Sequence, residues 1–175
     1  MGFQRAEADH GVFYKQIGVD ITVLTVHVDD CMISGSSANL ISEFKFQMNK
    51  IYILSDLGPI YWLLGTKVTR DLPNHTISLS QHAYIDSILL HFNFTGLKPS
   101  SIPMDPSAPL LKSQSPTKLA DITRMKNIPY CEAVGLLMYA AMGTRPDIVF
   151  TVSTVAQFLD NPRWVHWEAA KRIFR

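Results

Sequence analysis

The chain has 175 residues, of which 47% are hydrophobic and 18% charged, and its formal net charge is +1 at pH 7. This composition is typical of a globular protein and excludes a disordered one, and the length suffices for one domain, or one and a half, with a real core. A charge so close to zero argues against a self-sufficient nucleic-acid-binding domain, because such domains are usually strongly basic; it argues less strongly against a part of one.

The N-terminal third predicts a small antiparallel sheet. Residues 10–17 predict a first strand, and residues 18–20 a turn after it. Residues 21–28 and 31–35 are rich in β-branched side chains, which are stiff at χ1 and suit a pleated sheet. The two aspartates between these strands, Asp29 and Asp30, are therefore expected at a tight hairpin turn.

This pair of carboxylates has two interpretations. Alternation places Thr25, His27 and Asp29 on the more polar face of the strand, so Asp29 should face a polar cleft and Asp30 the opposite side. Carboxylates on a rigid hairpin suit Mg²⁺, which binds oxygen ligands and keeps waters and substrate phosphates in its shell. Alternatively, both are ordinary turn residues, because Asp bonds nearby backbone N–H groups. Against the second interpretation, a two-residue hairpin turn selected for folding alone favours Asn-Gly or Asp-Gly.

A helix and a hairpin are predicted next. Ser36 and Ser37 offer an N-cap for a helix of about 15 residues, one face of which should pack on the sheet. Its apolar positions are Leu40, Ile41, Phe44, Met48, Ile51 and Tyr52. Residues 60–70 then predict a strand with Gly65 as a bulge or a point of close approach. Turn residues at 72–75 and alternation at 76–80 predict a strand that pairs back.

The remainder predicts helices interrupted by a linker. Ser80 could cap a helix whose buried stripe is Tyr84, Ile85, Ile88, Leu89 and Phe92. From residue 95 to 128 the pattern ends, and five prolines among Ser, Lys and Thr predict a linker without regular structure between units at 1–94 and 129–175. Its basic positions could bind nucleic acid, although a solvated linker is the simpler account. They are Lys98, Lys112, Lys118, Arg124 and Lys126.

Three helices are expected after the linker. The first covers residues 130–142, with Val134, Leu137, Met138 and Ala141 on one side. Thr144-Arg145-Pro146-Asp147 then signals a helix start, with a capping Thr, an early Pro and an acid against the helix dipole. The apolar positions of this second helix are Ile148, Val149, Val152, Val155, Ala156 and Leu159. Residues 164–175 begin a third, with Trp164, Trp167, Ala170 and Phe174 as packing positions; it has no stop signal, which predicts a truncated segment.

Cysteine usage and the lack of a long apolar run bear on the compartment. Cys31 and Cys131 are far apart and have no second Cys or His at ligand spacing, which predicts free thiols in a reducing compartment and neither a disulfide framework nor a zinc site. No run is long enough for a membrane span, and the first ten residues do not resemble a signal peptide. We therefore expect an intracellular protein.

A series of short stretches stands out along nearly the whole chain. They are Val26-His27-Val28-Asp29-Asp30-Cys31-Met32-Ile33-Ser34-Gly35, Asp56-Leu57-Gly58 with Trp62-Leu63-Leu64-Gly65, Leu79-Ser80-Gln81-His82-Ala83-Tyr84-Ile85, Ile102-Pro103-Met104, Tyr130 with Gly135-Leu136-Leu137-Met138-Tyr139, Thr144-Arg145-Pro146-Asp147-Ile148, and Asn161-Pro162 with His166-Trp167 and Ala169-Ala170-Lys171-Arg172-Ile173. In this order they resemble the motifs of the reverse transcriptase region of copia-type (Pseudoviridae) retrotransposon Pol polyproteins, beginning with its Tyr-Val-Asp-Asp box.

The resemblance implies an α+β fold. It would be a partial right-hand polymerase palm, with an antiparallel sheet and packed helices in residues 1–94, followed by a helical thumb or connection segment in residues 129–175. By the same resemblance Asp29 would be a ligand to catalytic Mg²⁺ and Asp30 its supporting partner. Trp62, Leu63, Leu64 and Gly65 would form the hairpin that holds the primer strand, although Trp62 could equally be a core aromatic.

The resemblance also implies partners. The positions at which this sequence departs from the family's motifs limit the activity that we expect. The partners would be an RNA template, a DNA primer and the rest of a polyprotein, in a cytoplasmic particle or the nucleus, with no membrane. The family's other metal-binding aspartate and its fingers lie upstream of the matched motifs; His27 replaces the usual Tyr, and Cys131 the usual Arg. We therefore expect a fragment of an RNA-directed DNA polymerase that is inactive alone. The alternatives are a non-catalytic module that binds nucleic acid or protein, and a non-functional transposon remnant.

Overall fold

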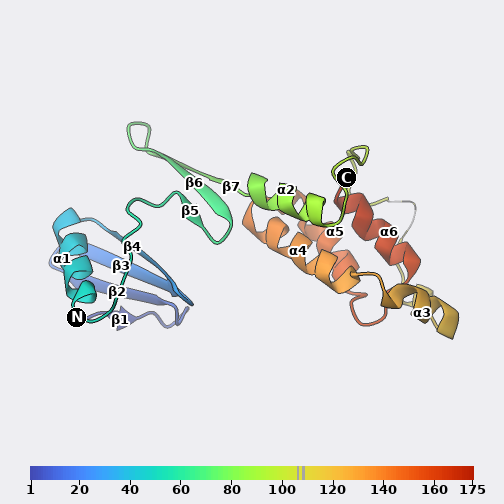
Figure 1. The fold of residues 1–175 in the computed structure, drawn as a ribbon, viewed down its shortest axis with the longest axis horizontal. Helices are drawn as coiled ribbons and strands as arrows, with labels where there is room; N and C mark the ends of the chain where they lie inside the picture. The colour runs from blue at the N-terminus through green and yellow to red at the C-terminus, as the bar shows by residue number, and fades with distance from the viewer. Residues whose placement is uncertain (106, 108) are drawn as a thin grey trace. The chain divides into compact units, whose positions relative to one another are not determined.

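The chain folds into two compact units, Met1–Ile60 and Tyr61–Arg175, in a computed structural model that describes residues 1–105, 107 and 109–175. Both units combine antiparallel strands with helices, which confirms the α+β class (Figure 1). The units are divided at Ile60, whereas the sequence predicted a boundary within residues 95–128. Pro106, one of the linker prolines, lies outside the described residues.

The first unit is a four-stranded antiparallel sheet with one helix. Its strands follow the order of the chain, β1 (Gln4–Arg5), β2 (Val12–Ile17), β3 (Asp20–His27) and β4 (Asp30–Gly35). The predicted strands of this region are therefore confirmed within a residue or two. The helix α1 (Ala38–Asn49) packs against β4, and Phe44 in it meets the ring of Phe3 edge-on at 5.2 Å.

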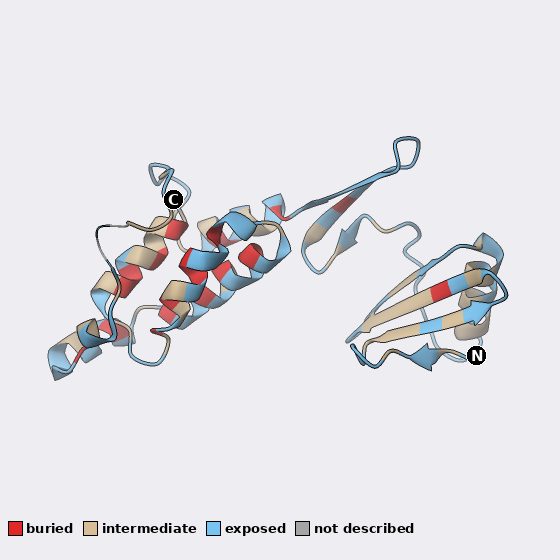
Figure 2. Ribbon diagram, turned by 180° about the vertical axis from the view of Figure 1, so that it is seen from behind, coloured by how far each residue is buried: buried red, intermediate tan, exposed pale blue. Residues whose placement is uncertain are grey.

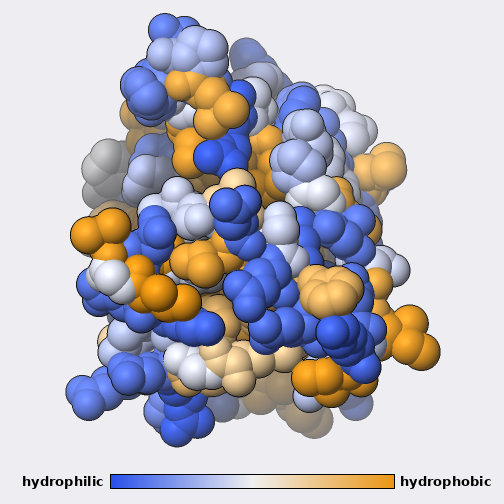
Figure 3. Space-filling model, turned by 90° about the vertical axis from the view of Figure 1, so that its left-hand side faces the viewer, coloured by the Kyte–Doolittle hydropathy of each residue, from blue (hydrophilic) through white to orange (hydrophobic). Residues whose placement is uncertain are grey.

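Burial in this first unit is shallow. Within residues 1–60, all of which are described, Thr22 alone is buried. The predicted inner face of α1 is half-buried at Leu40, Ile41, Phe44 and Met48. Ile51 and Tyr52 were predicted to extend this face, but the helix ends at Asn49 and both side chains are exposed. Figure 3, seen from the side drawn at the left of Figure 1, shows hydrophobic atoms at the surface among hydrophilic ones.

The second unit opens with a three-stranded sheet. It consists of β5 (Trp62–Leu63), β6 (Thr66–Asp71) and β7 (Thr76–Ser80), paired in chain order. The single strand predicted for residues 60–70 is therefore wrong, because the chain reverses at Leu64 and Gly65. The predicted turn at residues 72–75 and the strand that pairs back after it are confirmed.

A helical bundle follows and contains the hydrophobic core. Its main helices are α2 (His82–His91), α4 (Tyr130–Gly143), α5 (Val149–Ala156) and α6 (Trp164–Ile173), with the short 3₁₀ helix η2 (Pro146–Ile148) before α5. Buried residues line the inner faces of these helices (Figure 2). They include Tyr130, Ala133, Val134, Leu137, Ala141, Ile148, Val152, Val155, Trp167 and Ala170. The helical period of the sequence therefore located most of the core, although Met138 and Val149 are exposed.

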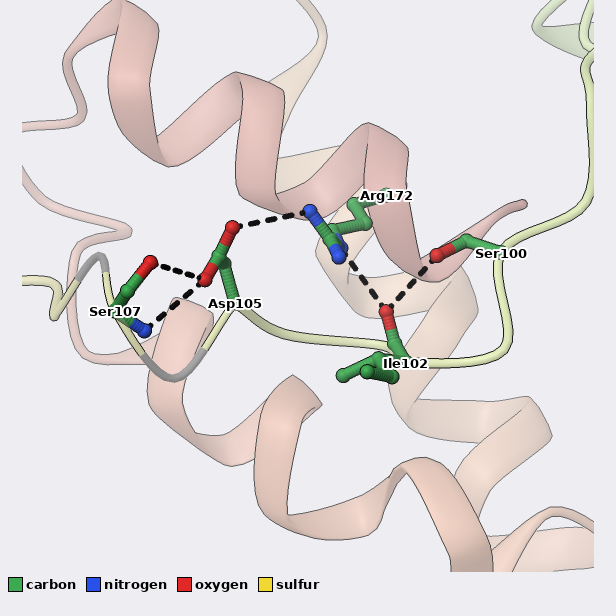
Figure 4. Close-up of polar contacts among 5 residues, drawn as sticks. All are labelled: Ser100, Ile102, Asp105, Ser107 and Arg172. Carbon is green, nitrogen blue, oxygen red and sulfur yellow. Dashed lines mark hydrogen bonds and ion pairs between the residues drawn. The ribbon is translucent and has the colours of Figure 1, made fainter.

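The Pro-rich segment is not structureless, contrary to prediction. It contains the 3₁₀ helix η1 (Lys112–Gln114) and the helix α3 (Leu119–Lys126), which places Met125 in the core. Its first part lies along α6, where Arg172 Nε donates to the Ile102 carbonyl at 3.0 Å and its guanidinium lies 3.5 Å from Asp105 (Figure 4). The Ser100 N–H also donates to the Arg175 carbonyl at 2.8 Å. These contacts attach the segment to the bundle.

The role of Thr144 at a helix end differs from the sequence prediction. Thr144 was predicted to cap the helix that opens at Pro146, but it is the C-terminal cap of α4 and its hydroxyl donates to Gln81 Oε1 at 2.9 Å. Among the described residues, no helix is both long and apolar enough to cross a membrane.

Candidate functional site

The two aspartates lie at the end of the β3–β4 hairpin. His27 pairs with Asp30 across the two strands, so Val28 and Asp29 form the turn itself. The turn therefore begins one residue earlier than predicted, and Asp30 is the first residue of β4. Both aspartates are exposed. Asp29 therefore lies at an exposed turn, at the place where the sequence predicted a polar cleft.

The backbone of this turn is strained. Val28 has φ +53°, in the left-handed region that β-branched residues rarely adopt. Its side chain is 84% exposed, so no packing of the side chain stabilises this conformation. Strain of this kind, of roughly 1–2 kcal/mol per residue, occurs preferentially at functional sites.

The carboxylates can serve as ligands for a hard cation, but they come from one turn only. Among the described residues, no three His, Cys, Asp or Glu side chains form a group able to hold a metal. Asp9 comes from the loop whose Gly11 carbonyl accepts the Val26 N–H at 2.8 Å, next to the end of β3. The Asp9 carboxylate, however, accepts the Gly11 N–H at 2.8 Å. The carboxylates of this turn alone would therefore fill only part of a Mg²⁺ coordination shell.

The hairpin predicted to hold a primer lies in the second unit. Trp62, Leu63, Leu64 and Gly65 form the end of the β5–β6 hairpin, and Leu64 and Gly65 have φ +49° and +73°. Gly65 is therefore a turn glycine rather than a bulge or a point of close approach, because no atom lies within 4 Å of the position its Cβ would take. Trp62 is 55% exposed, which excludes the alternative of a core aromatic.

Two tyrosines to which the sequence analysis gave no role at this hairpin connect it to the bundle. The Tyr139 hydroxyl on α4 donates to the Leu64 carbonyl. Tyr84 on α2 packs edge-on against the Tyr139 ring at 5.0 Å, and its own hydroxyl donates to the Leu136 carbonyl at 2.9 Å. Burial, and to a lesser degree Tyr139, raise the pKa of Tyr84. Tyr139 and Tyr84 both lie in stretches that were noted in the sequence, but the pattern gave no signal that they meet.

A second junction, centred on Gln81, joins β7 and α2 to the end of α4. Gln81 is buried between β7 and α2, and its amide oxygen accepts the Thr144 hydroxyl. A Cβ at Gly143 would lie 2.5 Å from that oxygen, so a side chain at this position would displace the end of the Gln81 side chain. The Gln81 amide nitrogen has no partner among the described residues. The junction therefore fixes the start of α2 against the end of α4.

His166 is a buried titratable group that the sequence analysis placed only as part of a motif. Its ring stacks on Phe158 at 4.0 Å, and its Nδ1 accepts the Arg163 N–H at 3.0 Å. Burial, and then the charge of Arg163, lower the pKa of His166. Its Nε2 has no partner within the described part of the chain. His166 thus serves as a neutral cap of α6.

Basic side chains gather around an exposed tryptophan where α3 meets α6. The Arg124 guanidinium lies 4.3 Å, and the Lys171 ammonium 5.1 Å, from the centre of the Trp164 ring. A groove of about 410 Å³ beside them is also lined by acids, since Asp121 lies 3.6 Å from Arg163 and Glu168 lies 2.6 Å from Lys171. Opposite charges therefore compensate each other within this groove.

Comparison with known proteins identifies the family of this chain. Residues 1–106 match the family described as reverse transcriptase (RNA-dependent DNA polymerase), and the chain belongs to this family. It is 37% identical over 174 residues to the retrovirus-related Pol polyprotein from transposon TNT 1-94 of Nicotiana tabacum, and 35% identical over 175 residues to that from transposon RE1 of Arabidopsis thaliana. These relatives confirm that the chain is a copia-type reverse transcriptase fragment.

The chain corresponds to a limited part of these relatives. It covers 13% of the tobacco protein and 11% of the Arabidopsis one, although 99% and 100% of the chain is matched. A putative transposon Ty5-1 protein of Saccharomyces cerevisiae is 33% identical over 175 residues, and the chain covers 54% of it. No solved structure matches the chain.

Proposed function

We propose that this chain contributes the aspartate turn of a Mg²⁺-dependent reverse transcriptase, an enzyme that extends a DNA primer along an RNA template. The single observation that carries this proposal is the pair of exposed carboxylates, Asp29 and Asp30, held on a rigid and strained hairpin end within a chain of the reverse transcriptase family. In this proposal residues 1–94 belong to the palm, and the helices of residues 129–175 to a thumb or connection segment.

Asp29 and Asp30 would hold Mg²⁺ through their carboxylate oxygens. When bound, such ions stabilise the attacking 3′-hydroxyl oxygen and the leaving phosphate oxygen of nucleotidyl transfer. Hard cations of this type keep waters and substrate phosphates among their ligands, so two protein carboxylates are a realistic share of the shell. The β3–β4 register supplies the rigidity, because a catalytic ligand must be held in place by the scaffold.

The hairpin of residues 62–65 would hold the primer strand. Three properties support this role: a tight turn, an exposed Trp62, and the contact of Leu64 with α4. An exposed aromatic can stack on a base or pack against a sugar, which holds a strand without reading its sequence. The partners in this proposal are an RNA template and a DNA primer, and the remaining ligands and the nucleotide pocket come from other parts of a polyprotein.

A binding module without catalysis is the second candidate function. The cluster of Arg124, Lys171 and Trp164 favours it, because cations beside an aromatic are typical of nucleic-acid-binding surfaces. Asp121 and Glu168, however, line the same groove. An acidic lining repels phosphates, so the polymerase assignment is better supported.

The test is primer extension by the purified chain on an RNA template with Mg²⁺. We expect no synthesis above background, because Asp29 and Asp30 come from a single turn, whereas two ions that clamp both reacting oxygens need ligands from more than one element. Template-dependent synthesis that is lost in Asp29→Asn, and kept in Asp71→Asn as a control at another turn, would show instead that the chain completes its own site.

A further inference from the structure

A hydrogen bond from α4 links the turn of the β5–β6 hairpin to the helical bundle. Tyr139 lies in the last part of α4, 75 residues from Leu64, and its hydroxyl donates to the Leu64 carbonyl at the turn. The turn is otherwise exposed, since a Cβ added at Gly65 would meet no atom within 4 Å beyond its chain neighbours, and both Leu64 and Trp62 are exposed. β6 pairs with β7 and contacts α2, whereas β5, with two residues, pairs with β6 alone. Two strands paired in this way are marginally stable by themselves, so the position of the turn depends on its contact with Tyr139.

The tyrosine that makes this tie is itself held in place. The Tyr84 ring meets the Tyr139 ring edge-on, with an angle of 77° between their planes. The Tyr84 hydroxyl donates to the Leu136 carbonyl, one turn before Tyr139 on the same helix. Tyr84 thus links α2 to α4 and limits the directions in which the Tyr139 ring can point. Hairpin, α2 and α4 meet at these two rings.

We propose that Tyr139 is a positioning residue that sets the β5–β6 hairpin for the nucleic-acid strand it holds. It acts through the Leu64 carbonyl and does not touch the strand itself. The identity of the held strand rests on the proposed function, whereas the coupling between Tyr139 and the hairpin rests on the observed contacts alone. A functional hairpin needs support of this kind, because side chains on a loosely held element lose the geometry that binding requires.

The chain offers a matched pair of variants. Tyr139→Phe and Tyr14→Phe each remove one hydroxyl that donates a hydrogen bond, which for Tyr14 goes to the Gln4 side chain in the first unit, and each keeps its ring. Only the first removes a contact with the hairpin. Hydrogen exchange of the amides of residues 61–68, among them the Val68 N–H that donates to the Tyr61 carbonyl, reports how firmly the hairpin is held. We expect exchange there to be roughly 2- to 10-fold faster in Tyr139→Phe, the range that the loss of one hydrogen bond allows, and unchanged in Tyr14→Phe.

Binding of a fluorescent DNA primer on an RNA template, measured by anisotropy in EDTA, provides the second readout. We expect Tyr139→Phe to weaken binding by a similar factor of roughly 2 to 10, and Tyr14→Phe to bind as the wild type does. Equal effects of the two variants in either assay, or no change of hairpin exchange in Tyr139→Phe, would overturn the inference. A wild-type chain that does not bind the primer–template would contradict the proposed function, and the exchange data would still decide whether Tyr139 controls the hairpin.

Discussion

Val28 has a backbone conformation that is unusual for a β-branched residue in a hairpin turn. A two-residue hairpin turn is relaxed with Asn-Gly or Asp-Gly, which accept positive φ. Here a valine takes that conformation at φ +53°, and Asp29 and Asp30 follow it. Folding alone gives no reason for this choice, because an exposed valine gains nothing from packing. The strain agrees with a turn whose residues are kept for the position of their carboxylates.

His166 makes stability depend on pH. Because its pKa is lowered in the folded chain, the unfolded chain binds the proton more tightly. The stabilisation is therefore complete above the ordinary pKa of about 6.5 and is lost as the pH falls below it. We expect the melting temperature of the wild type to fall more between pH 7.5 and 5 than that of His166→Gln, in which glutamine can still accept the capping N–H.

The size of this effect follows from the separation of the two pKa values. Each unit of separation is worth about 1.4 kcal/mol of stability. Thermal unfolding monitored by circular dichroism over this pH range measures it. A difference between wild type and His166→Gln that stays constant with pH would show that His166 does not titrate on unfolding.

Elements with a clear period could be predicted from the sequence, and those that depend on tertiary contacts could not. The strands around the aspartates follow from β-branched runs, and α4 from its helical repeat. The hairpin at Leu64 was missed because Leu-Gly is not one of the usual turn pairs. Helix α3 was missed because prolines surround it and because its one buried side chain, Met125, gains its environment only from the bundle.

The candidate site was predictable to a similar extent. The aspartate pair and Trp62 could be named from their motifs, because the roles proposed for them rest on their own side chains. Tyr139 and Gln81 act through contacts with elements far along the chain, so nothing in their own neighbourhood reveals them. Burial of His166 likewise results from packing against Phe158 and not from local sequence.

Buried hydrophobic side chains are unevenly distributed between the two units. In the described residues, every buried hydrophobic side chain lies in the second unit, from Val68 onward. The segment 51–59, which ends the first unit, is exposed throughout. By contrast, the Pro-rich segment is attached to α6 through Arg172 and to the core through Met125. The bundle should therefore hold together when the first unit does not.

Limited proteolysis tests this division. We expect the first cuts within residues 51–60 and a resistant product that begins near Tyr61, because local opening needs little energy where few apolar contacts are lost. The masses of the early fragments identify the cut. First cleavage within residues 95–128 would instead support the Pro-rich linker that the sequence predicted, and would contradict the observed attachment of this segment.

The most direct measurement for the aspartate turn uses Mn²⁺ as a paramagnetic substitute for Mg²⁺. We expect Mn²⁺ to broaden selectively the amide NMR signals of residues 27–31, and the double substitution Asp29→Asn with Asp30→Asn to abolish this broadening. Asp71→Asn is the matched control, because Asp71 is an exposed turn aspartate whose carboxylate accepts two hydrogen bonds from Asn74; it should leave the broadening unchanged. Broadening that is absent from residues 27–31, or that persists in the double variant, would contradict the assignment of Asp29 and Asp30 as metal ligands.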